Sequence, residues 1–328
     1  MTILVTGSAG HLGEALIRSL RSAERSASGV DIKPSALTDR VGSIGDRAFI
    51  KQAMKGVRAV LHTATLHKPH VVTHSYQEFL DTNVAGTLAL LEEAAAEGVG
   101  SFIFTSTTSA FGSALTPAGG EPAAWVTEDV VPVPKNIYGA TKLAAETLCE
   151  LFARKHRLPV IVLRTSRFFP EVDDDPAIRD NYGADNAQAN ELLNRRVDLE
   201  DVVSAHLLAI ERARHIGFGR YIVSATTPLT QDDLAALRKN APEVVHQLFP
   251  DCEALFGTRN WSLFPHIDRV YVNDLARSEL GWHPKYDFRH VLECLRAGKD
   301  FRSPLAREIG SKGYHDAVFE EGPYLVTQ

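Results

Sequence analysis

The sequence predicts an α/β fold, with helices on both faces of a doubly wound parallel sheet. Two observations carry this prediction. From residue 2 to about residue 165, short apolar runs alternate with longer amphipathic stretches, as in repeated β-α units. The first apolar run also leads straight into three closely spaced glycines and a helical pattern. With 328 residues, 44% of them hydrophobic, the chain is long enough for one large domain and a smaller one.

The first element is a strand over residues 2–6, and the three glycines that follow it are spaced G-x-x-G-x-x-G. Glycine allows a tight turn and lets backbone N–H groups approach a phosphate, while the positive end of a helix dipole favours negative charge. This turn between a strand and a helix therefore predicts a Rossmann-type fold with a site for a dinucleotide pyrophosphate. The residues expected around it are Gly7, Ala9, Gly10, His11, Leu12 and Gly13.

The second strand is expected to end at Asp31. A carboxylate there can accept hydrogen bonds from the adenosine ribose and would repel a 2′-phosphate, so Asp31 favours NAD over NADP. An ordinary turn aspartate is the alternative, and the nearby Lys33 and Arg40 weaken the preference. Asp46 is expected after a third strand, at the adenine edge of the coenzyme.

The later elements of the first half follow from apolar spacing. Strands are expected over residues 58–62, 101–106 and 158–163, and helices over 75–98 and 137–156. Beyond about residue 165 the pattern changes. The stretch 170–190 is acidic, polar and loop-like, and shorter helices are expected near 200–213, 231–239 and 273–280.

These elements predict two domains. We expect an NAD-binding Rossmann domain over residues 1–165, to which residues 196–225 return. A small C-terminal substrate-binding part is expected over residues 166–195 and 226–328.

The catalytic signal is Tyr138-Gly-Ala-Thr-Lys142. Residues four apart share a face of a helix, so the phenol and the ammonium can meet. A free tyrosine has a pKa of ~10, and a lysine cation together with an oxidised nicotinamide favours the phenolate. The phenolate can take a proton from an alcohol while hydride leaves for the coenzyme. Surface helices carry such pairs by chance, but this one follows a strand end rich in hydroxyls.

That strand end is Phe104-Thr-Ser-Thr-Thr-Ser-Ala-Phe-Gly112. The carboxyl end of a central strand faces the crevice in which ligands bind. A hydroxyl there can donate to a substrate oxygen and stabilise the charge that develops on it. Only one or two of the five hydroxyls can reach the substrate, and the others are simply a polar strand end.

With these motifs in place, the chain resembles the extended short-chain dehydrogenases/reductases, in particular the NAD-dependent epimerase/dehydratase family. The matching stretches are Gly7–Gly13, Asp31, Gly45-Asp46, Leu61–Ala64, Asn83–Thr87, 104–112, Tyr138–Lys142 and Leu280-Gly-Trp282 with Pro284. The resemblance implies that Thr107 is the catalytic Ser/Thr, that Tyr138 is the acid/base, and that Lys142 is its partner and holds the nicotinamide ribose. It also implies a dimer formed through the helices near 75–98 and 137–156. Further coenzyme contacts are expected at Thr63, Ala64, Asn83 and Thr105, and a substrate contact at Thr108.

Three departures from the family pattern concern the substrate. Arg167 stands where sugar-nucleotide epimerases carry an asparagine, Asn194-Arg195 replaces their Arg-Asp, and no Arg-Pro-Gly-Asp precedes Tyr271. Other arginines could supply anion contacts. They are Arg164, Arg167, Arg195, Arg196, Arg259 and Arg269.

We expect Arg167 to meet an anionic, carbohydrate-like substrate, because it lies just beyond the carboxyl end of a strand. A salt bridge from Arg167 to Glu171 or to the aspartates at 173–175 is the alternative.

A histidine cluster follows the strand 58–62. His67, His70 and His74 are spaced i, i+3, i+7, but no cysteine or carboxylate completes a metal site, and none is predicted. We expect a loop beside the nicotinamide in which His67 or Lys68 faces the substrate, with a plain structural role as the alternative. The acidic run 171–176 is interpreted as a solvated turn rather than a cation site.

Charge and cysteine content limit the partners. The net charge of −6 provides no basic surface for nucleic acid or an anionic membrane. No apolar run approaches the ~20 residues of a membrane-spanning helix, and no signal peptide is recognised. The three cysteines have no metal-ligand spacing, and so low and odd a number suggests a reducing compartment. We therefore expect a cytoplasmic protein.

Three functions remain open. The first, which we expect, is a (nucleotide-)sugar epimerase with tightly held NAD. The second is a net NAD-dependent dehydrogenase or reductase of a non-nucleotide sugar, sugar acid or small carbonyl compound, which the altered contacts favour. The third is a non-catalytic NAD-sensing regulator, against which the retained Tyr138 and Lys142 argue. A dehydratase is disfavoured, because Thr108 and Ser109 stand where that subgroup carries Asp-Glu.

Overall fold

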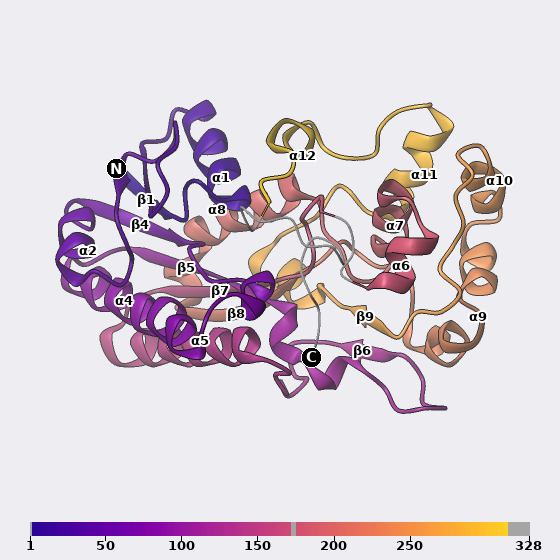
Figure 1. The fold of residues 1–328 in the computed structure, drawn as a ribbon, viewed down its shortest axis with the longest axis horizontal. Coiled ribbons are helices and arrows are strands. Elements are labelled where there is room, and N and C mark those ends of the chain that lie inside the picture. Colours follow the sequence, from indigo (N-terminus) through magenta and orange to yellow (C-terminus); the bar gives the residue numbers. More distant parts are fainter. Residues whose placement is uncertain (1, 172–174, 314–328) are drawn as a thin grey trace.

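The predicted parallel sheet is confirmed. The computed structural model describes residues 2–171 and 175–313. Seven parallel strands lie in the order β3-β2-β1-β4-β5-β7-β8 (Figure 1). They are β1 Thr2–Thr6, β2 Ala27–Asp31, β3 Arg40–Val41, β4 Val57–His62, β5 Ser101–Thr107, β7 Val160–Thr165 and β8 Phe218–Val223. The chain moves from β1 to β3 on one side and from β4 to β8 on the other, so the order reverses between β1 and β4. A crevice outside the carboxyl ends of the strands is the usual ligand site at such a point.

Helices cover both faces of this sheet, which makes it the doubly wound Rossmann type. Helices α1, α8 and α12 pack on one face, and α2, α4 and α5 pack on the other (Figure 1). Their bounds are α1 His11–Ser22, α8 Leu199–Ile216, α12 Pro304–Ile309, α2 Arg47–Ala53, α4 Gly86–Ala96 and α5 Ile137–His156.

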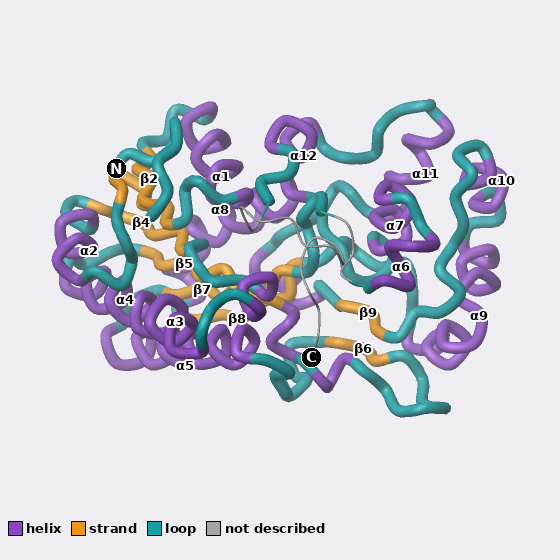
Figure 2. The backbone as a smooth tube through the Cα atoms, in the orientation of Figure 1, coloured by secondary structure: helices purple, strands orange, loops and turns teal. Residues whose placement is uncertain are grey.

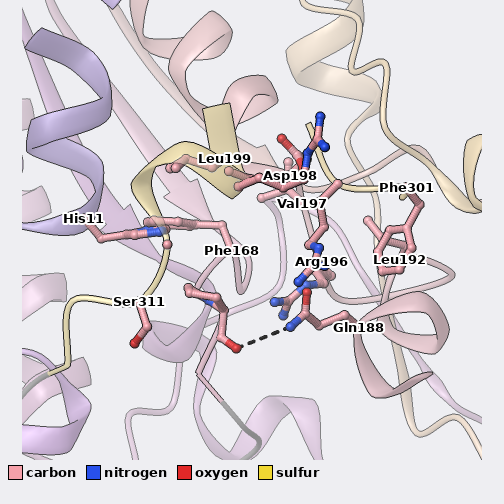
Figure 3. A pocket seen from close by; sticks show the side chains of 15 residues that line it. His11, Phe168, Gln188, Leu192, Arg196, Val197, Asp198, Leu199, Phe301 and Ser311 are labelled. Carbon is pink, nitrogen blue, oxygen red and sulfur yellow. Dashed lines mark hydrogen bonds between the residues drawn. The ribbon is translucent and has the colours of Figure 1, made fainter. Parts of the chain in front are cut away.

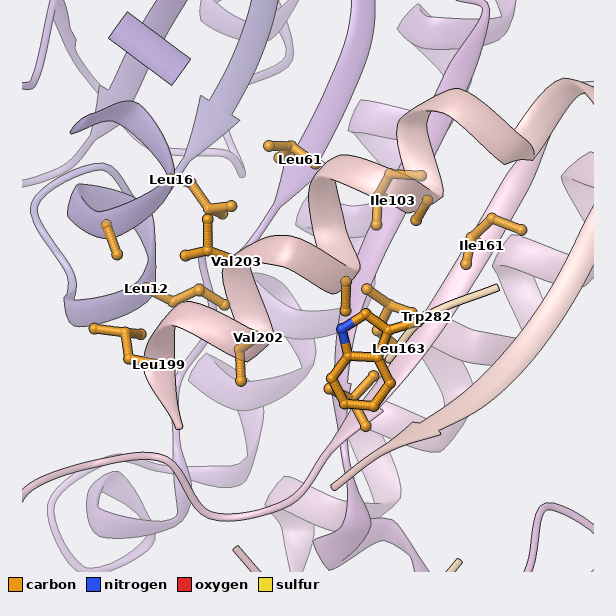
Figure 4. Close-up of a cluster of buried hydrophobic side chains, with 14 of the residues drawn as sticks. Leu12, Leu16, Leu61, Ile103, Ile161, Leu163, Leu199, Val202, Val203 and Trp282 are labelled. Atoms are coloured by element: carbon orange, nitrogen blue, oxygen red, sulfur yellow. The ribbon is translucent and has the colours of Figure 1, made fainter. Parts of the chain in front are cut away.

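Alternate strand residues point into two separate cores, because successive side chains of a strand face opposite ways. On the α1–α8 face, Leu61, Ile103 and Leu163 pack with Val202 of α8 and with Trp282 (Figure 4). The Trp282 indole N–H donates to the Ser204 hydroxyl at 2.9 Å, so the buried ring has its polar atom paired. Both faces are covered, and for this reason the strands are continuous apolar runs in the sequence.

A second part of the molecule is built around its own apolar core. It contains a two-stranded parallel sheet of β6 Ala124–Val126 and β9 Arg269–Tyr271 (Figure 2). Its helices are α6 Pro176–Asn181, α7 Ala184–Glu191, α9 Leu234–Leu248, α10 Cys252–Gly257 and α11 Phe288–Arg296. Strand β6 lies within the first 165 residues, so this part also draws on a short segment from there.

Two local expectations were wrong. The stretch expected as a loop over 170–190 contains helices α6 and α7. The helix expected over 75–98 is three helical segments, α3 Tyr76–Phe79, a π-helical stretch Leu80–Ala85 and α4. Ser75 caps the first segment by accepting from the Glu78 N–H. The wider π turn changes the direction in which Asn83 points, and such turns often occur at functional sites.

The remaining short elements are η1 Lys68–Val72, η3 Thr108–Phe111, η4 Ser113–Leu115, η5 Gln231–Asp233 and a π turn Ala276–Leu280. All three cysteines are buried free thiols. No helix in the described part of the chain is both long and apolar enough to cross a membrane.

Candidate active site

A cavity of about 550 Å³ lies along the carboxyl ends of the strands and receives residues from both parts of the molecule. The strand order places the β1 turn and Asp31 of β2 on one side. Thr107 of β5 and Arg167, just after β7, lie on the other. Tyr138 and Lys142 line the same cavity from α5. The predicted coenzyme, catalytic and substrate residues therefore meet in one place.

The glycine turn between β1 and α1 has no room for side chains. A Cβ on Gly13 would lie 1.9 Å from the Gly7 carbonyl oxygen, and Gly7 has a φ of +73° with a Cβ position 2.9 Å from the Ala64 nitrogen. Gly10 precedes α1 without a side-chain cap, so the first amides of this 12-residue helix face the cavity without a capping oxygen. That combination fits a pyrophosphate.

Asp31 ends β2 at the cavity wall. Its carboxylate accepts from the Ala9 N–H at 2.9 Å and from the Lys33 N–H at 2.8 Å. These bonds hold the carboxylate beside the glycine turn, where an adenosine ribose would lie. Together with the turn, this geometry fits NAD.

Asp46 follows the third strand as expected but is not among the residues that line the cavity. Strand β3 ends earlier, at Val41, and Asp46 is the exposed N-cap of α2, where it accepts from the Phe49 N–H at 3.1 Å. The cavity is lined here by Gly42, Ser43 and Ile44 instead.

The expected contact residues after β4 divide into two groups. Thr63 and Ala64 line the cavity, and their N–H groups donate to the Thr6 hydroxyl at 3.2 Å. Asn83 is buried behind them, where it accepts from the Leu66 N–H at 2.8 Å. Asn83 therefore shapes the loop that lines the cavity and is not itself among the lining residues.

The catalytic trio gathers where β5 meets α5. Tyr138 is 6% exposed, and burial raises its pKa to about 12, although a hydrogen bond shared with the Thr107 side chain acts in the opposite direction. Thr107 also accepts from the Ser109 N–H at 3.0 Å, which fixes its hydroxyl at the end of β5. The phenol and the threonine hydroxyl are thus already paired.

Lys142 lines the cavity beside the end of β5. Its ammonium donates to the Thr105 carbonyl at 2.6 Å and lies 4.1 Å from the centre of the Phe104 ring. Burial lowers the pKa of Lys142 to about 7. Thr105 also lines the cavity, and its hydroxyl is paired with the His206 ring nitrogen Nε2 at 2.8 Å.

The loop after β4 also reaches the cavity. His67 and Lys68 both line it, and the His67 ring lies 5.9 Å from the Tyr138 ring. Burial lowers the pKa of His67 to about 3, so its imidazole is neutral at physiological pH. Thr108 lines the cavity on the side of β5.

Arginines gather at the end of the cavity beyond β7. Arg167, Arg195 and Arg269 line it. Arg195 pairs with the buried Glu191 carboxylate at 2.9 Å, and the Nε of Arg167 is 3.9 Å from the same carboxylate. Arg167 also donates to the Glu171 backbone carbonyl at 2.8 Å rather than to its carboxylate. Asp173 and Asp174, two of the carboxylates in the alternative salt bridge, lie outside the described residues.

The other arginines considered do not line this cavity. Arg164 and Arg196 are buried in ion pairs with Glu146 and Glu191, and Arg259 is exposed. Among residues 2–171 and 175–313, no group of three or more His, Cys, Asp or Glu side chains is placed to hold a metal ion. Asp175 caps α6 by accepting from the Ala177 N–H.

The lining residues that sequence reasoning missed include Phe168, Phe169 and Tyr271. Phe168 and Phe169 follow Arg167 directly, and their rings lie in tilted contact with centres 4.3 Å apart. Arg269 and Tyr271 are two apart on β9 and so share a face of that strand. That spacing could have been recognised once a strand was predicted there.

A second cavity of about 330 Å³ adjoins the first and shares His11 and Phe168 with it (Figure 3). The two rings stack with centres 5.9 Å apart. Burial lowers the pKa of His11 to about 4, and both ring nitrogens lack a hydrogen-bond partner among the described residues. Gln188, on the far wall, donates to the Pro170 carbonyl at 3.3 Å.

The sheet order, the glycine turn and the Tyr-Lys pair in one cavity define an NAD-dependent Rossmann enzyme of the extended short-chain dehydrogenase/reductase type. The model of the NAD dependent epimerase/dehydratase family matches residues 3–223, and the chain belongs to that family.

Two relatives that match over nearly their full length are named for nucleotide-sugar reactions. The chain is 25% identical to a UDP-glucose 4-epimerase of Azospirillum brasilense, over 95% of this chain and 94% of that protein. It is 27% identical to a dTDP-glucose 4,6-dehydratase of Streptomyces antibioticus, over 94% and 96%. A match to an uncharacterised protein of Sinorhizobium fredii, at 29% identity, covers 50% of this chain and only 40% of that protein.

Solved structures show the same fold. A short-chain dehydrogenase/reductase superfamily protein from Agrobacterium tumefaciens with bound NAD has a TM-score of 0.63 at 24% identity, covering 94% of this chain and 99% of that chain. A UDP-glucose 4-epimerase from Thermotoga maritima with UDP-glucose has a TM-score of 0.61 at 24% identity, covering 91% and 99%.

Proposed function

We propose that this enzyme oxidises and reduces a hydroxyl-bearing carbon of an anionic, carbohydrate-like substrate, and that it is a nucleotide-sugar epimerase. The main support is that Thr107, Tyr138 and Lys142 line one cavity with the glycine turn, while Arg167, Arg195 and Arg269 line its far end. Full-length similarity to a UDP-glucose 4-epimerase supports the epimerase class.

Each side chain has a defined task in this proposal. The Thr107 hydroxyl donates to the reacting oxygen, and Tyr138 as phenolate takes the hydroxyl proton. NAD, held by the glycine turn and Asp31, would supply reversible hydride transfer at the reacting carbon. Tyr138 would return the proton to the oxygen when that carbon is reduced again. The positive charge of Lys142 stabilises the phenolate during the step.

Native mass spectrometry combined with product analysis tests this function. We expect NAD to remain bound through purification, and one of a set of UDP- and dTDP-linked hexoses and hexuronic acids to give its epimer without net NADH. If no member of the set is epimerised by protein that carries NAD, the epimerase assignment fails.

A net dehydrogenase is the second candidate, because three arginines line the cavity beyond β7. Such a cluster suits a carboxylate close to the reacting carbon as well as a diphosphate further away. The same assay distinguishes the two, since a dehydrogenase of a sugar acid would form NADH in step with product and would release it.

We expect Arg167→Ala to raise KM for the substrate about tenfold while changing NAD affinity less than about twofold, because the guanidinium would contact only the substrate. Steady-state kinetics and a coenzyme titration measure the two effects. Arg259→Ala is the control, since Arg259 is exposed and outside the cavity. An unchanged KM would contradict an anion contact at Arg167.

We also propose that the protein is a homodimer through the face formed by α3, its π-helical extension and α5. Tyr76 and Leu80, four apart on this face, are 67% and 43% exposed. We expect light scattering to give twice the mass of the chain, and Tyr76→Glu with Leu80→Glu to give a monomer, because buried carboxylates would oppose the contact. Leu248→Glu on α9 is the control. A monomeric unmodified protein would rule out the dimer.

A further inference from the structure

Glu146 is a fully buried carboxylate that the proposed chemistry does not use. It lies on α5, one turn beyond Lys142, and its side chain is 0% exposed. The Ser106 hydroxyl donates to it at 2.6 Å, and Arg164 donates through Nε at 3.0 Å and Nη2 at 2.7 Å. The Nε of Arg220 is 3.0 Å away. One carboxylate therefore joins α5 to β5, β7 and β8.

These contacts adjoin Thr107, Tyr138 and Lys142 along β5 and α5. Ser106 immediately precedes Thr107 on β5. The Arg164 guanidinium lies 4.7 Å from the ring centre of Phe111, in the short helix that follows Thr107. Tyr138, Lys142 and Glu146 are spaced by four on the buried face of α5. Anchoring Glu146 to Ser106 and Arg164 therefore fixes the spacing between Thr107 and Tyr138.

The same carboxylate acts on the charge of Lys142. Burial lowers the pKa of Lys142, while the negative charge of Glu146 raises it. The Cys149 thiol on α5 is protonated, because burial raises its pKa. His62 on β4 and His67 before η1 are neutral, because burial lowers the pKa of both rings. Among these groups, only Glu146 offers Lys142 a full opposite charge.

Burying this network opposes folding unless the charges are well paired, since two ions must leave water. An apolar contact could join α5 to β5 without that penalty. We therefore attribute this buried ionic network to the orientation of α5 and the charge beside Lys142, and not to a gain in stability.

We propose that Glu146 is a positioning residue of the active site, which locks α5 to the Thr107 strand end and places a negative charge one helical turn from Lys142. This inference rests on the proposed roles of Tyr138 and Lys142. Glu146 is not itself among the residues that line the cavity, so it acts only through these neighbours.

Glu146→Gln tests the proposal, with Glu150→Gln as the matched control. The control removes the same charge one turn further along α5, from a side chain that is 46% exposed and pairs with Arg220 at 3.3 Å. We expect Glu146→Gln to lower kcat about tenfold at neutral pH, with KM nearly unchanged. The reason is that loss of the carboxylate charge would lower the pKa of Lys142 by about one unit. The control should keep the original kcat.

The pH profile separates this role from a merely structural one. Without Glu146, Lys142 gives up its proton at a lower pH, and a neutral lysine no longer stabilises the phenolate. The ratio of unmodified to variant kcat should therefore grow between about pH 6 and about pH 8. A ratio that is constant with pH would overturn the electrostatic part of the proposal.

Ser106→Ala is a second test that can be used if Glu146→Gln does not fold. It removes one hydrogen bond, from the Ser106 hydroxyl to the Glu146 carboxylate, which holds the strand end next to Thr107. We expect kcat to fall about threefold, as for the loss of a hydrogen bond between a neutral and a charged group. An unchanged kcat would overturn the positioning part. If Tyr138→Phe keeps its activity while Glu146→Gln loses it, the proposed function fails rather than this inference.

Discussion

Turnover should fall about 100-fold or more when Tyr138 is replaced by phenylalanine, which is the usual contribution of a general acid–base group. The phenyl ring keeps its place against Thr107 and the buried face of α5, because only the hydroxyl is lost. NAD affinity should therefore change little. Steady-state turnover and a calorimetric NAD titration measure these two effects on the same protein.

Tyr182→Phe is the matched control for this experiment. Tyr182 lies between α6 and α7, where its ring meets Phe264 edge-on, and it does not line the coenzyme cavity. Its loss should leave turnover unchanged. Near-normal turnover of the Tyr138→Phe enzyme would require another residue to carry the proton.

NAD should bind more than tenfold more tightly than NADP, because the Asp31 carboxylate would lie beside the ribose 2′ position and repel a phosphate there. Asp31→Ala should narrow that gap by weakening NAD and relieving the repulsion of NADP. Titration of both coenzymes against both proteins gives the four dissociation constants needed.

Asp46 offers a control that the sequence alone would not have suggested. It caps α2 outside the cavity, so Asp46→Ala should reduce stability by about 1 kcal/mol without changing the ratio of the two affinities. Equal affinities of the unmodified protein for NAD and NADP would show that Asp31 is only a turn residue.

The sheet and the glycine turn were predictable because their physical requirements are local. Strands buried on both faces must be apolar throughout, and the turn before α1 excludes any Cβ at Gly13. The hydroxyls after β5 and the pair on α5 were recognisable for the same reason. Each motif occupies consecutive residues or one helical turn.

Helix α7 was not predictable from its pattern. It contains Asn186, Gln188, Asn190 and Glu191, all of them buried, and no apolar stripe. Its polar side chains are paired with distant backbone, as when Asn190 donates to the Ser262 carbonyl at 2.9 Å and accepts from the Phe264 N–H at 2.7 Å. A polar sequence is normally typical of a loop, and only the tertiary partners make it a buried helix.

The arginine end of the cavity could be predicted only in part, because its members come from three distant segments. Arg167 follows a strand, and its position beside the cavity could be inferred. Arg195 and Arg269 arrive from the end of α7 and from β9, and nothing local distinguishes them from solvated arginines. Arg195 is held in place by a tertiary contact, the ion pair at 2.9 Å with the buried carboxylate of Glu191.

The last strand of the sheet, β8, limits how this enzyme can be recombined with its relatives. The chain leaves the sheet after β7, builds α6 and α7, and returns through α8 to add β8 at the edge. In a fragment that ended after β7, strand β7 would have no β8 to pair with. Ile103 and Leu163 would also lose their packing against α8. The β6–β9 part also takes its first strand from within the first 165 residues. Exchange of substrate preference between relatives therefore calls for grafting several short segments onto an intact sheet, not for joining two halves at one point.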